Sequence, residues 1–217
     1  MLELRDLGRL PYREAWALQE HLRATRLLGR GKNTVLLVEH PPVFTLGHRD
    51  CDEDILSPRE VIAAEGIEIV KSNRGGRITY HGPGQLVGYF ICQIADCGMA
   101  VGDFVTAIEE LCLRVLADFG VRGQRDADHP GIWLGRDKIV AIGLHFSHGV
   151  SQHGFALNVN PDLTHYRHIL PCGIRDRGVT SLAHMLKTAP PMAAVKERVA
   201  AQLAEFSLKR PIRPRKK

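Results

Sequence analysis

The 217-residue chain lacks the features that place a protein in or across a membrane. No apolar run approaches the roughly 18 residues that a spanning helix needs. The first sixteen residues, MLELRDLGRLPYREAW, contain three acidic side chains and no apolar block. They therefore match neither a signal peptide nor an acid-poor transit peptide. We expect a cytoplasmic protein that does not associate with membranes.

Cysteine is scarce, and its spacing forms no known framework. The five cysteines are odd in number, and no two of them form a Cys-x-x-Cys pair. This argues against a disulfide scaffold and against a zinc knuckle. Cys92 and Cys112 lie in apolar patterns typical of small core residues, and we expect Cys51 and Cys97 to be inert thiols.

Metal-binding and nucleotide-binding motifs are also missing. The eleven histidines show no metal-ligand spacing, so we expect no metal. His81 and His153 are predicted to shape a pocket, and His148 to lie exposed in a turn. The glycine-rich stretch of residues 73–86 is not followed by Gly-Lys-Ser/Thr, which excludes a P-loop. A strand pattern follows it instead of a helix, which excludes a dinucleotide fingerprint.

The net charge of +5 comes largely from the end of the chain, KRPIRPRKK at 209–217. We expect this segment to be a frayed basic tail. No interleaving of aromatic and basic residues accompanies it, so the sequence does not predict nucleic-acid binding. Attraction to an acidic protein partner fits the charge equally well. No repeat or linker divides the rest, and we expect residues 1–208 to form a single domain.

Hydrophobic periodicity predicts helices and strands in an α+β arrangement. The strands occur in hairpin-like clusters separated by helices, which favours a mixed, mostly antiparallel sheet flanked by helices. The polar turn Ser147-His148-Gly149 predicts a hairpin between the last two strands. Ser57 and Asp103 are predicted helix caps. The expected helices are 11–28, 57–64, 103–119, a short one near 180, and 193–206; the expected strands are 34–40, 67–71, 86–94, 131–134, 138–146 and 152–159.

The stretch NRGGRITYHGPGQL at 73–86 combines four glycines with cationic and ring-bearing side chains. Glycine permits positive φ and close approach to the backbone. Arg74 stands beside bare backbone N–H groups, Tyr80 and His81 precede a second glycine turn, and Gln85 adds an amide. These residues predict a groove for an extended ligand with a polar head. The simpler alternative is a strand-to-strand loop in which the glycines only satisfy turn geometry.

Cys172 and Lys138 are candidate catalytic residues on their own chemistry. Cys172 lies between Pro171 and Gly173 in an expected loop, and Lys138 stands at the start of an apolar strand. A catalytic thiol must be partly thiolate, and a nearby cation lowers its pKa from about 8.5. An incidental thiol and an exposed lysine remain the alternatives, because nothing in the spacing brings these two residues together.

Four blocks of the sequence, in order, resemble the lipoyl(octanoyl) transferases. The strongest is RGGRITYHGPGQLVGYF at 74–90. The others are LLVEHPPVFTLG at 36–47, DKIVAIGLHF with HGFALNVN between 137 and 160, and ILPCGIRDRGVTSL at 169–182. The resemblance implies a fold similar to the catalytic domains of biotin and lipoate protein ligases.

The resemblance also implies a catalytic pair and an acyl-binding site. The family's acyl-accepting cysteine and its lysine fall on Cys172 and Lys138. Three segments line the acyl group in that family, and small residues on facing strands would leave a slot for an alkyl chain. Carried over, they are Arg74, Gly75, Gly76, Arg77, Ile78, Thr79, Tyr80 and His81; Ala141, Ile142 and Gly143; and Gly154, Phe155 and Ala156.

The implied reaction is an acyl transfer that needs no cofactor. Octanoyl-acyl carrier protein would be the donor, and Cys172 would carry the octanoyl group as a thioester. Lipoyl domains of 2-oxoacid dehydrogenases and the glycine cleavage H protein would be the acceptors, as the first step of endogenous protein lipoylation. Two alternatives remain: an ATP-dependent lipoate or biotin protein ligase, and a non-catalytic protein that binds acyl carriers.

Overall fold

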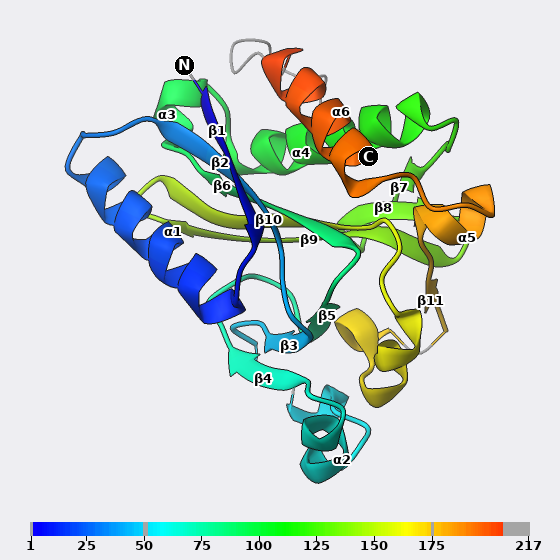
Figure 1. Ribbon diagram of the computed structural model, residues 1–217. Coiled ribbons are helices and arrows are strands. Elements are labelled where there is room, and N and C mark those ends of the chain that lie inside the picture. The colour runs from blue at the N-terminus through cyan, green and yellow to red at the C-terminus, as the bar shows by residue number, and fades with distance from the viewer. Residues whose placement is uncertain (1, 50–51, 175, 206–217) are drawn as a thin grey trace.

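The computed structural model describes residues 2–49, 52–174 and 176–205 (Figure 1). The predicted basic tail at 209–217, the expected end of the last helix at Phe206, and Cys51 lie outside the described residues. Within them, no helix is both long and apolar enough to cross a bilayer.

A mixed, mostly antiparallel sheet forms the centre of the fold, as predicted. Its order is β1 (Leu2–Arg9), β2 (Asn33–Glu39), β6 (Gln85–Ile91), β10 (Val150–Asn158), β9 (Asp137–Ser147), β8 (Gly131–Leu134) and β7 (Gln124–Arg125). Along this path only the β1–β2 pair is parallel. The short β11 (Gly178–Val179) pairs in parallel with β9. A smaller sheet has the order β4 (Glu68–Lys71), β3 (Val43–Leu46) and β5 (Thr79–His81).

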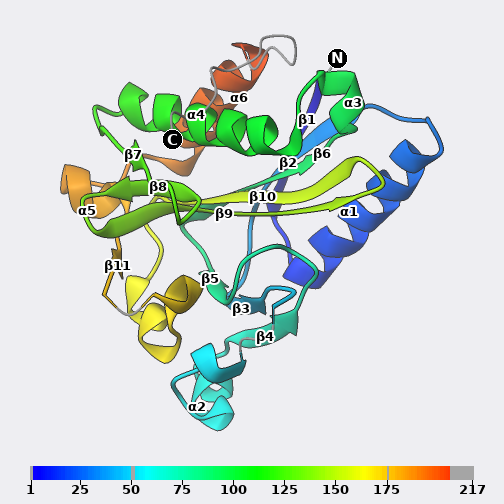
Figure 2. The same cartoon turned by 180° about the vertical axis from the view of Figure 1, so that it is seen from behind.

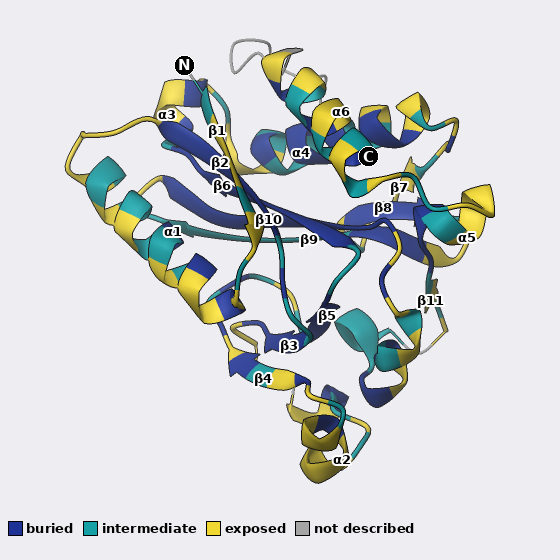
Figure 3. Ribbon diagram, viewed as in Figure 1, coloured by how far each residue is buried: buried dark blue, intermediate teal, exposed yellow. Residues whose placement is uncertain are grey.

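Helices cover both faces of the main sheet. α4 (Val101–Asp118) and α6 (Met192–Glu205) lie on one face, and α1 (Tyr12–Leu27) lies on the other (Figures 1 and 2). Because side chains alternate along a strand, β2 sends Val35 and Leu37 toward α4 and sends Leu36 and Val38 toward α1. Figure 3 shows the resulting buried centre. The other α-helices in the described part of the chain are α2 (Arg59–Ala64), α3 (Ile94–Cys97) and α5 (Leu182–Leu186), and short 3₁₀ helices cover Asp52–Asp54, Leu163–His168 and Pro171–Gly173.

The predicted helices and strands form, but the structure corrects both predicted caps. Pro58, not Ser57, occupies the N-cap of α2, and no side chain caps that helix. The Ser57 hydroxyl lies 2.8 Å from His168 Nδ1 instead. α4 begins two residues before Asp103, whose carboxylate accepts the backbone N–H of Ala100 at 3.4 Å. The Ser57 hydroxyl is thus engaged in a tertiary contact, and Asp103 acts from within the first turn of α4 on the N-cap residue Ala100.

The predicted hairpin between β9 and β10 positions the site described below. His148 and Gly149 both have positive φ, at 50° and 78°, which is the geometry of a two-residue type I′ turn. That turn sets the register, so Ala141 pairs with Ala156 and Gly143 with Gly154. The predicted segments 141–143 and 154–156 thus lie opposite each other and form one wall.

Candidate active site

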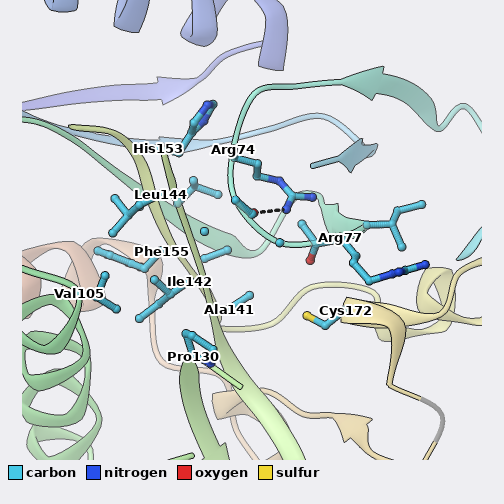
Figure 4. Close-up of a pocket in the computed structure, with 18 of the residues that line it drawn as sticks. Arg74, Arg77, Val105, Pro130, Ala141, Ile142, Leu144, His153, Phe155 and Cys172 are labelled. Atoms are coloured by element: carbon cyan, nitrogen blue, oxygen red, sulfur yellow. Dashed lines mark hydrogen bonds between the residues drawn. The ribbon is translucent and has the colours of Figure 1, made fainter. Parts of the chain in front are cut away.

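A partly open cavity of about 480 Å³ lies against the β9–β10 hairpin and the segment 74–79 (Figure 4). β9 is central in the sheet, yet its residues 141–147 are only partly buried, whereas all of β10 is buried. Thirteen of the fourteen predicted acyl-site residues line this cavity. Cys172 and Lys138 line it as well.

The glycine-rich segment 74–79 packs against β9 through main-chain contacts. The N–H of Gly75 donates to Leu144 O at 2.9 Å, and a Cβ at Gly143 would stand 2.8 Å from Gly75 O. Gly76 has φ of 86°, a value that side chains disfavour. The glycines therefore allow two backbones to approach each other, and this packing shapes the cavity in addition to any turn requirement.

The two arginines of the segment anchor it in different ways. Arg74 is buried and donates to Thr45 Oγ1 and Gly75 O, each at 3.0 Å. Arg77 pairs with Asp54 at 2.6 Å and with Glu53 at 2.5 Å. Hydrogen bonds to Asp54 and then Glu53 raise the pKa of Arg77, so its charge is tied to those carboxylates.

Tyr80 is the one predicted acyl-site residue that does not line the cavity. It lies between Thr79 and His81 on β5, and alternation along the strand sends it to the other side. There its ring packs edge-on against Phe44, and its hydroxyl lies 2.8 Å from His165 Nδ1. The structure thus gives Tyr80 a place in the core of the small sheet.

The chain brings Cys172 and Lys138 together at the cavity wall. The Lys138 ammonium lies 3.3 Å from Cys172 Sγ and 3.4 Å from Pro130 O. Lys138 is 7 % exposed, so its charge is held in a largely dehydrated position. After Cys172 the chain returns as β11, which pairs Val179 with Lys138. That pairing explains how two residues 34 positions apart become neighbours.

The backbone at Cys172 is held in a left-handed conformation, with φ of 57° and ψ of 13°. Its N–H donates to Ile78 O at 3.1 Å, which joins the loop to the glycine-rich segment. The N–H of Gly173 donates to Leu170 O at 3.0 Å. The backbone N–H groups of Cys172 and Gly173 are therefore both hydrogen-bonded already, so neither is free to stabilise an oxyanion.

Neutral histidines lie at and just behind the cavity wall: His81 and His153 line the cavity, and the His40 ring packs edge-on against His81. Burial lowers the pKa of His40 to about 4 and that of His153 to about 3, and it lowers the pKa of His81 well below its usual value. His40 lies 2.7 Å from both Leu10 O and the Tyr89 hydroxyl. Within the described parts of the chain, no group of three or more His, Cys, Asp or Glu side chains is placed to hold a metal ion.

These histidines predict a loss of stability in mild acid. Each has a lower pKa folded than unfolded, so the unfolded chain binds protons first as the pH falls. Their contribution is complete above about pH 6.5 and declines toward pH 4, approaching about 1.4 kcal/mol per pH unit for each ring. Urea unfolding at pH 7, 6 and 5 measures this. Equal unfolding free energies at pH 7 and pH 5 would contradict it.

Sequence reasoning missed the apolar lining that comes from outside the three predicted acyl-site segments. Val105 of α4 and the side chains of Leu144 and Phe146 of β9 line the cavity, as does Pro130. In Figure 4, Val105, Ile142 and Phe155 gather at the side away from Cys172. The helical periodicity predicts only the fully buried face that begins at the neighbouring Phe104. It therefore does not identify Val105 as a residue that lines the cavity.

Comparison with known proteins agrees with this architecture. The model of the lipoyl protein ligase A/B catalytic domain matches residues 11–204. An octanoyltransferase of Chloroflexus aggregans is 46% identical over 214 residues, which cover 97% of each chain. Among solved structures, lipoate-protein ligase A bound with ATP is similar at a TM-score of 0.77, with 17% identity and 95% and 85% of the two chains covered.

A second structural neighbour extends the likeness. The biotin protein ligase of Aquifex aeolicus, in complex with biotin and ATP, has a TM-score of 0.56 at 15% identity and covers 95% and 72% of the two chains. At these identities the two structures establish the fold alone. The family model and the sequence relative cover nearly the whole chain, and together they show that this protein belongs to the lipoyl protein ligase A/B catalytic domain family.

Proposed function

We propose that this protein is an octanoyltransferase that moves an octanoyl group from an acyl carrier protein to a lysine of a lipoyl domain. Cys172 would carry the group as a thioester. The observation that carries the proposal is the 3.3 Å approach of Lys138 Nζ to Cys172 Sγ on the wall of a partly apolar cavity. A thiol beside a buried ammonium is a ready nucleophile.

The first half-reaction forms the acyl-enzyme. The Cys172 proton passes to the Lys138 amine, and the thiolate attacks the carbonyl carbon of the donor thioester. The tetrahedral intermediate collapses with cleavage of the donor C–S bond. The departing carrier thiolate takes a proton from the Lys138 ammonium, so the carrier leaves as a thiol and Lys138 is neutral. Exchange of one thioester for another requires no ATP.

The second half-reaction forms the amide. The acceptor lysine attacks the acyl group on Cys172 as a free amine. Neutral Lys138 accepts the proton that this nitrogen loses, and the Cys172–carbonyl bond breaks to return the thiolate. The ammonium and the thiolate are then restored together. Lys138 thus serves both half-reactions. As an ammonium it protonates the departing carrier thiolate in the first, and as an amine it accepts the proton of the acceptor lysine in the second.

The apolar part of the cavity suits a straight acyl chain. Ile142 and Phe155 pair across the β9–β10 hairpin and line the cavity with Ala141 and Ala156. Each buried methylene would contribute about 0.8 kcal/mol. A chain of eight carbons would therefore bind far better than a short one. The polar side chains of Arg74 and His153 would end the apolar part of the lining and so limit the length of chain that it can bury.

An assay without ATP tests the function. The protein is incubated with octanoyl-acyl carrier protein and an unmodified lipoyl domain, and the mass of each component is followed. We expect the octanoyl mass to appear first on this chain and then on the lipoyl domain. A strict requirement for ATP and free octanoate would instead support a ligase. Binding of the carrier with no mass change on any component would support a non-catalytic role.

Val105 is predicted to limit the acyl chain length. Val105→Phe adds bulk to the lining away from Cys172, so we expect at least a tenfold loss of octanoyl transfer relative to butanoyl transfer, because several methylenes lose their burial. Competition between the two donors, read by mass on the acceptor, gives the ratio. Val101→Phe, at an exposed position on the same helix, is the control. An unchanged ratio in Val105→Phe would contradict the placement of the chain.

The same proposal includes the domain organisation and the partners. We assign residues 1–208 to one catalytic domain, which the family match to residues 11–204 supports. The acceptors we propose are the lipoyl domains of 2-oxoacid dehydrogenases and the glycine cleavage H protein. Transfer rates to each purified acceptor would rank them.

A further inference from the structure

Trp133 stands directly behind the Cys172–Lys138 pair. On the β8–β9 ladder Trp133 is the cross-strand partner of Lys138. The Lys138 ammonium lies 4.6 Å from the centre of the indole ring, which is 2 % exposed. A cation held against a buried aromatic face is attracted by the ring's electron density. Neither the mechanism above nor the sequence motifs use this ring.

The indole is itself fixed in place by the loop that precedes β8. Its N–H donates to His129 O at 3.1 Å. The next carbonyl along, Pro130 O, accepts from the Lys138 ammonium at 3.4 Å. The loop and the ring therefore hold Lys138 from two sides, while the thiol of Cys172 lies on a third.

A second cation restrains the same ring. The Arg177 guanidinium lies 4.6 Å from the ring centre and pairs with Asp126 at 2.5 Å. The Asp126 carboxylate also accepts the N–H groups of Asp128 and His129, each at 3.0 Å. The Arg177 hydrogen bond, together with these backbone bonds, lowers the pKa of Asp126 to about 2. The negative charge of Asp126 thus offsets Arg177 and limits its repulsion of Lys138.

We propose that Trp133 is a positioning residue that holds the Lys138 side chain beside Cys172 and favours its ammonium form over its amine. The inference rests on the proposed roles of Cys172 and Lys138. The indole attracts the ammonium and has no such attraction for a neutral amine. It therefore favours transfer of the thiol proton to Lys138, which leaves a thiolate. Arg177 and Asp126 keep the indole in the orientation that this contact needs.

Alkylation of Cys172 tests the proposal without any acyl donor. The protein is treated with iodoacetamide at pH 7, and modification is followed on the peptide that carries Cys172. We expect Trp133→Leu to slow alkylation about tenfold, and Trp133→Phe, which keeps an aromatic face, to recover most of the rate. Trp16→Phe is the matched control, because Trp16 lies on α1 and does not line the cavity.

A double-mutant cycle separates this role from a structural one. In a Lys138→Met background, Trp133→Leu should change the alkylation rate less than twofold, because the ring acts through the ammonium. A tenfold loss in that background would overturn the proposal, as would a native rate in folded Trp133→Leu. If Trp133→Leu does not fold, Trp133→Phe and Trp133→Met decide: equal rates in these two would contradict a role for the ring face. Because no acyl group is involved, these outcomes are independent of whether octanoyl transfer itself is found.

Discussion

Replacement of Cys172 by alanine is expected to abolish both the acyl-enzyme and turnover. Without the sulfur no thioester can form, and the remaining cavity only binds the acyl chain. We expect a rate loss on the order of 10⁴-fold or more, as for removal of other covalent nucleophiles. Intact-mass measurement after exposure to octanoyl-acyl carrier protein should show an unmodified Cys172→Ala chain and an octanoylated native chain.

The control uses a cysteine of a different kind. Cys112 is fully buried on α4, and burial, followed by the nearby Glu109 charge, raises the pKa of its thiol. It is therefore a neutral core residue at working pH. Cys112→Ala should still acquire the octanoyl mass, at some cost in stability from the small cavity left behind. An octanoyl mass that persists in Cys172→Ala and is lost in Cys112→Ala would move the nucleophile to Cys112.

The fold was predictable from the sequence where each element carries its own periodicity. The β9–β10 hairpin is an example, because Ser147-His148-Gly149 encodes the turn and the flanking strands are apolar. β1 was not predicted, because its residues are mostly exposed and its pairing is a parallel contact with β2. The two predicted caps were wrong for different reasons: a tertiary contact with His168 occupies the Ser57 hydroxyl, whereas the helix that Asp103 was expected to cap begins two residues earlier.

The site was predictable only in part. Among the small residues that line the cavity, Gly75, Gly143 and Gly154 are required locally, because a Cβ at each would collide with a neighbouring backbone oxygen. Tyr80 shows the limit of a contiguous motif, since alternation on β5 sends every second residue to the far side. Val105 and Trp133 reach the site through tertiary packing. Helix and strand patterns describe which residues are buried, but they do not say which cavity or cation a buried side chain faces.

Two substitutions of Lys138 are expected to separate its two roles. Lys138→Met keeps most of the length of the side chain but removes the charge, so Cys172 should lose its ammonium partner and react slowly in both half-reactions. We expect turnover to fall on the order of 10³-fold. Lys138→Arg keeps a cation near the thiol but cannot accept a proton, because guanidinium stays charged. Its cation can still stabilise the Cys172 thiolate, with solvent taking the thiol proton and protonating the departing carrier thiolate. It should therefore form the acyl-enzyme and then fail to pass the octanoyl group to the acceptor.

The mass of the chain during turnover distinguishes the two variants. Lys138→Arg should accumulate the octanoyl adduct, whereas Lys138→Met should accumulate almost none on the same timescale. The thermal midpoint of each variant is measured as well, and a midpoint within a few degrees of the native one shows that neither result reflects unfolding. Rapid turnover by Lys138→Arg would refute the proton-accepting role, and a native rate of adduct formation in Lys138→Met would refute thiol activation. Thiol activation needs the ammonium form of Lys138, whereas proton acceptance needs its amine form. The two variants therefore test these roles independently: adduct formation in Lys138→Met reports on the first half-reaction, and turnover of the adduct in Lys138→Arg reports on the second.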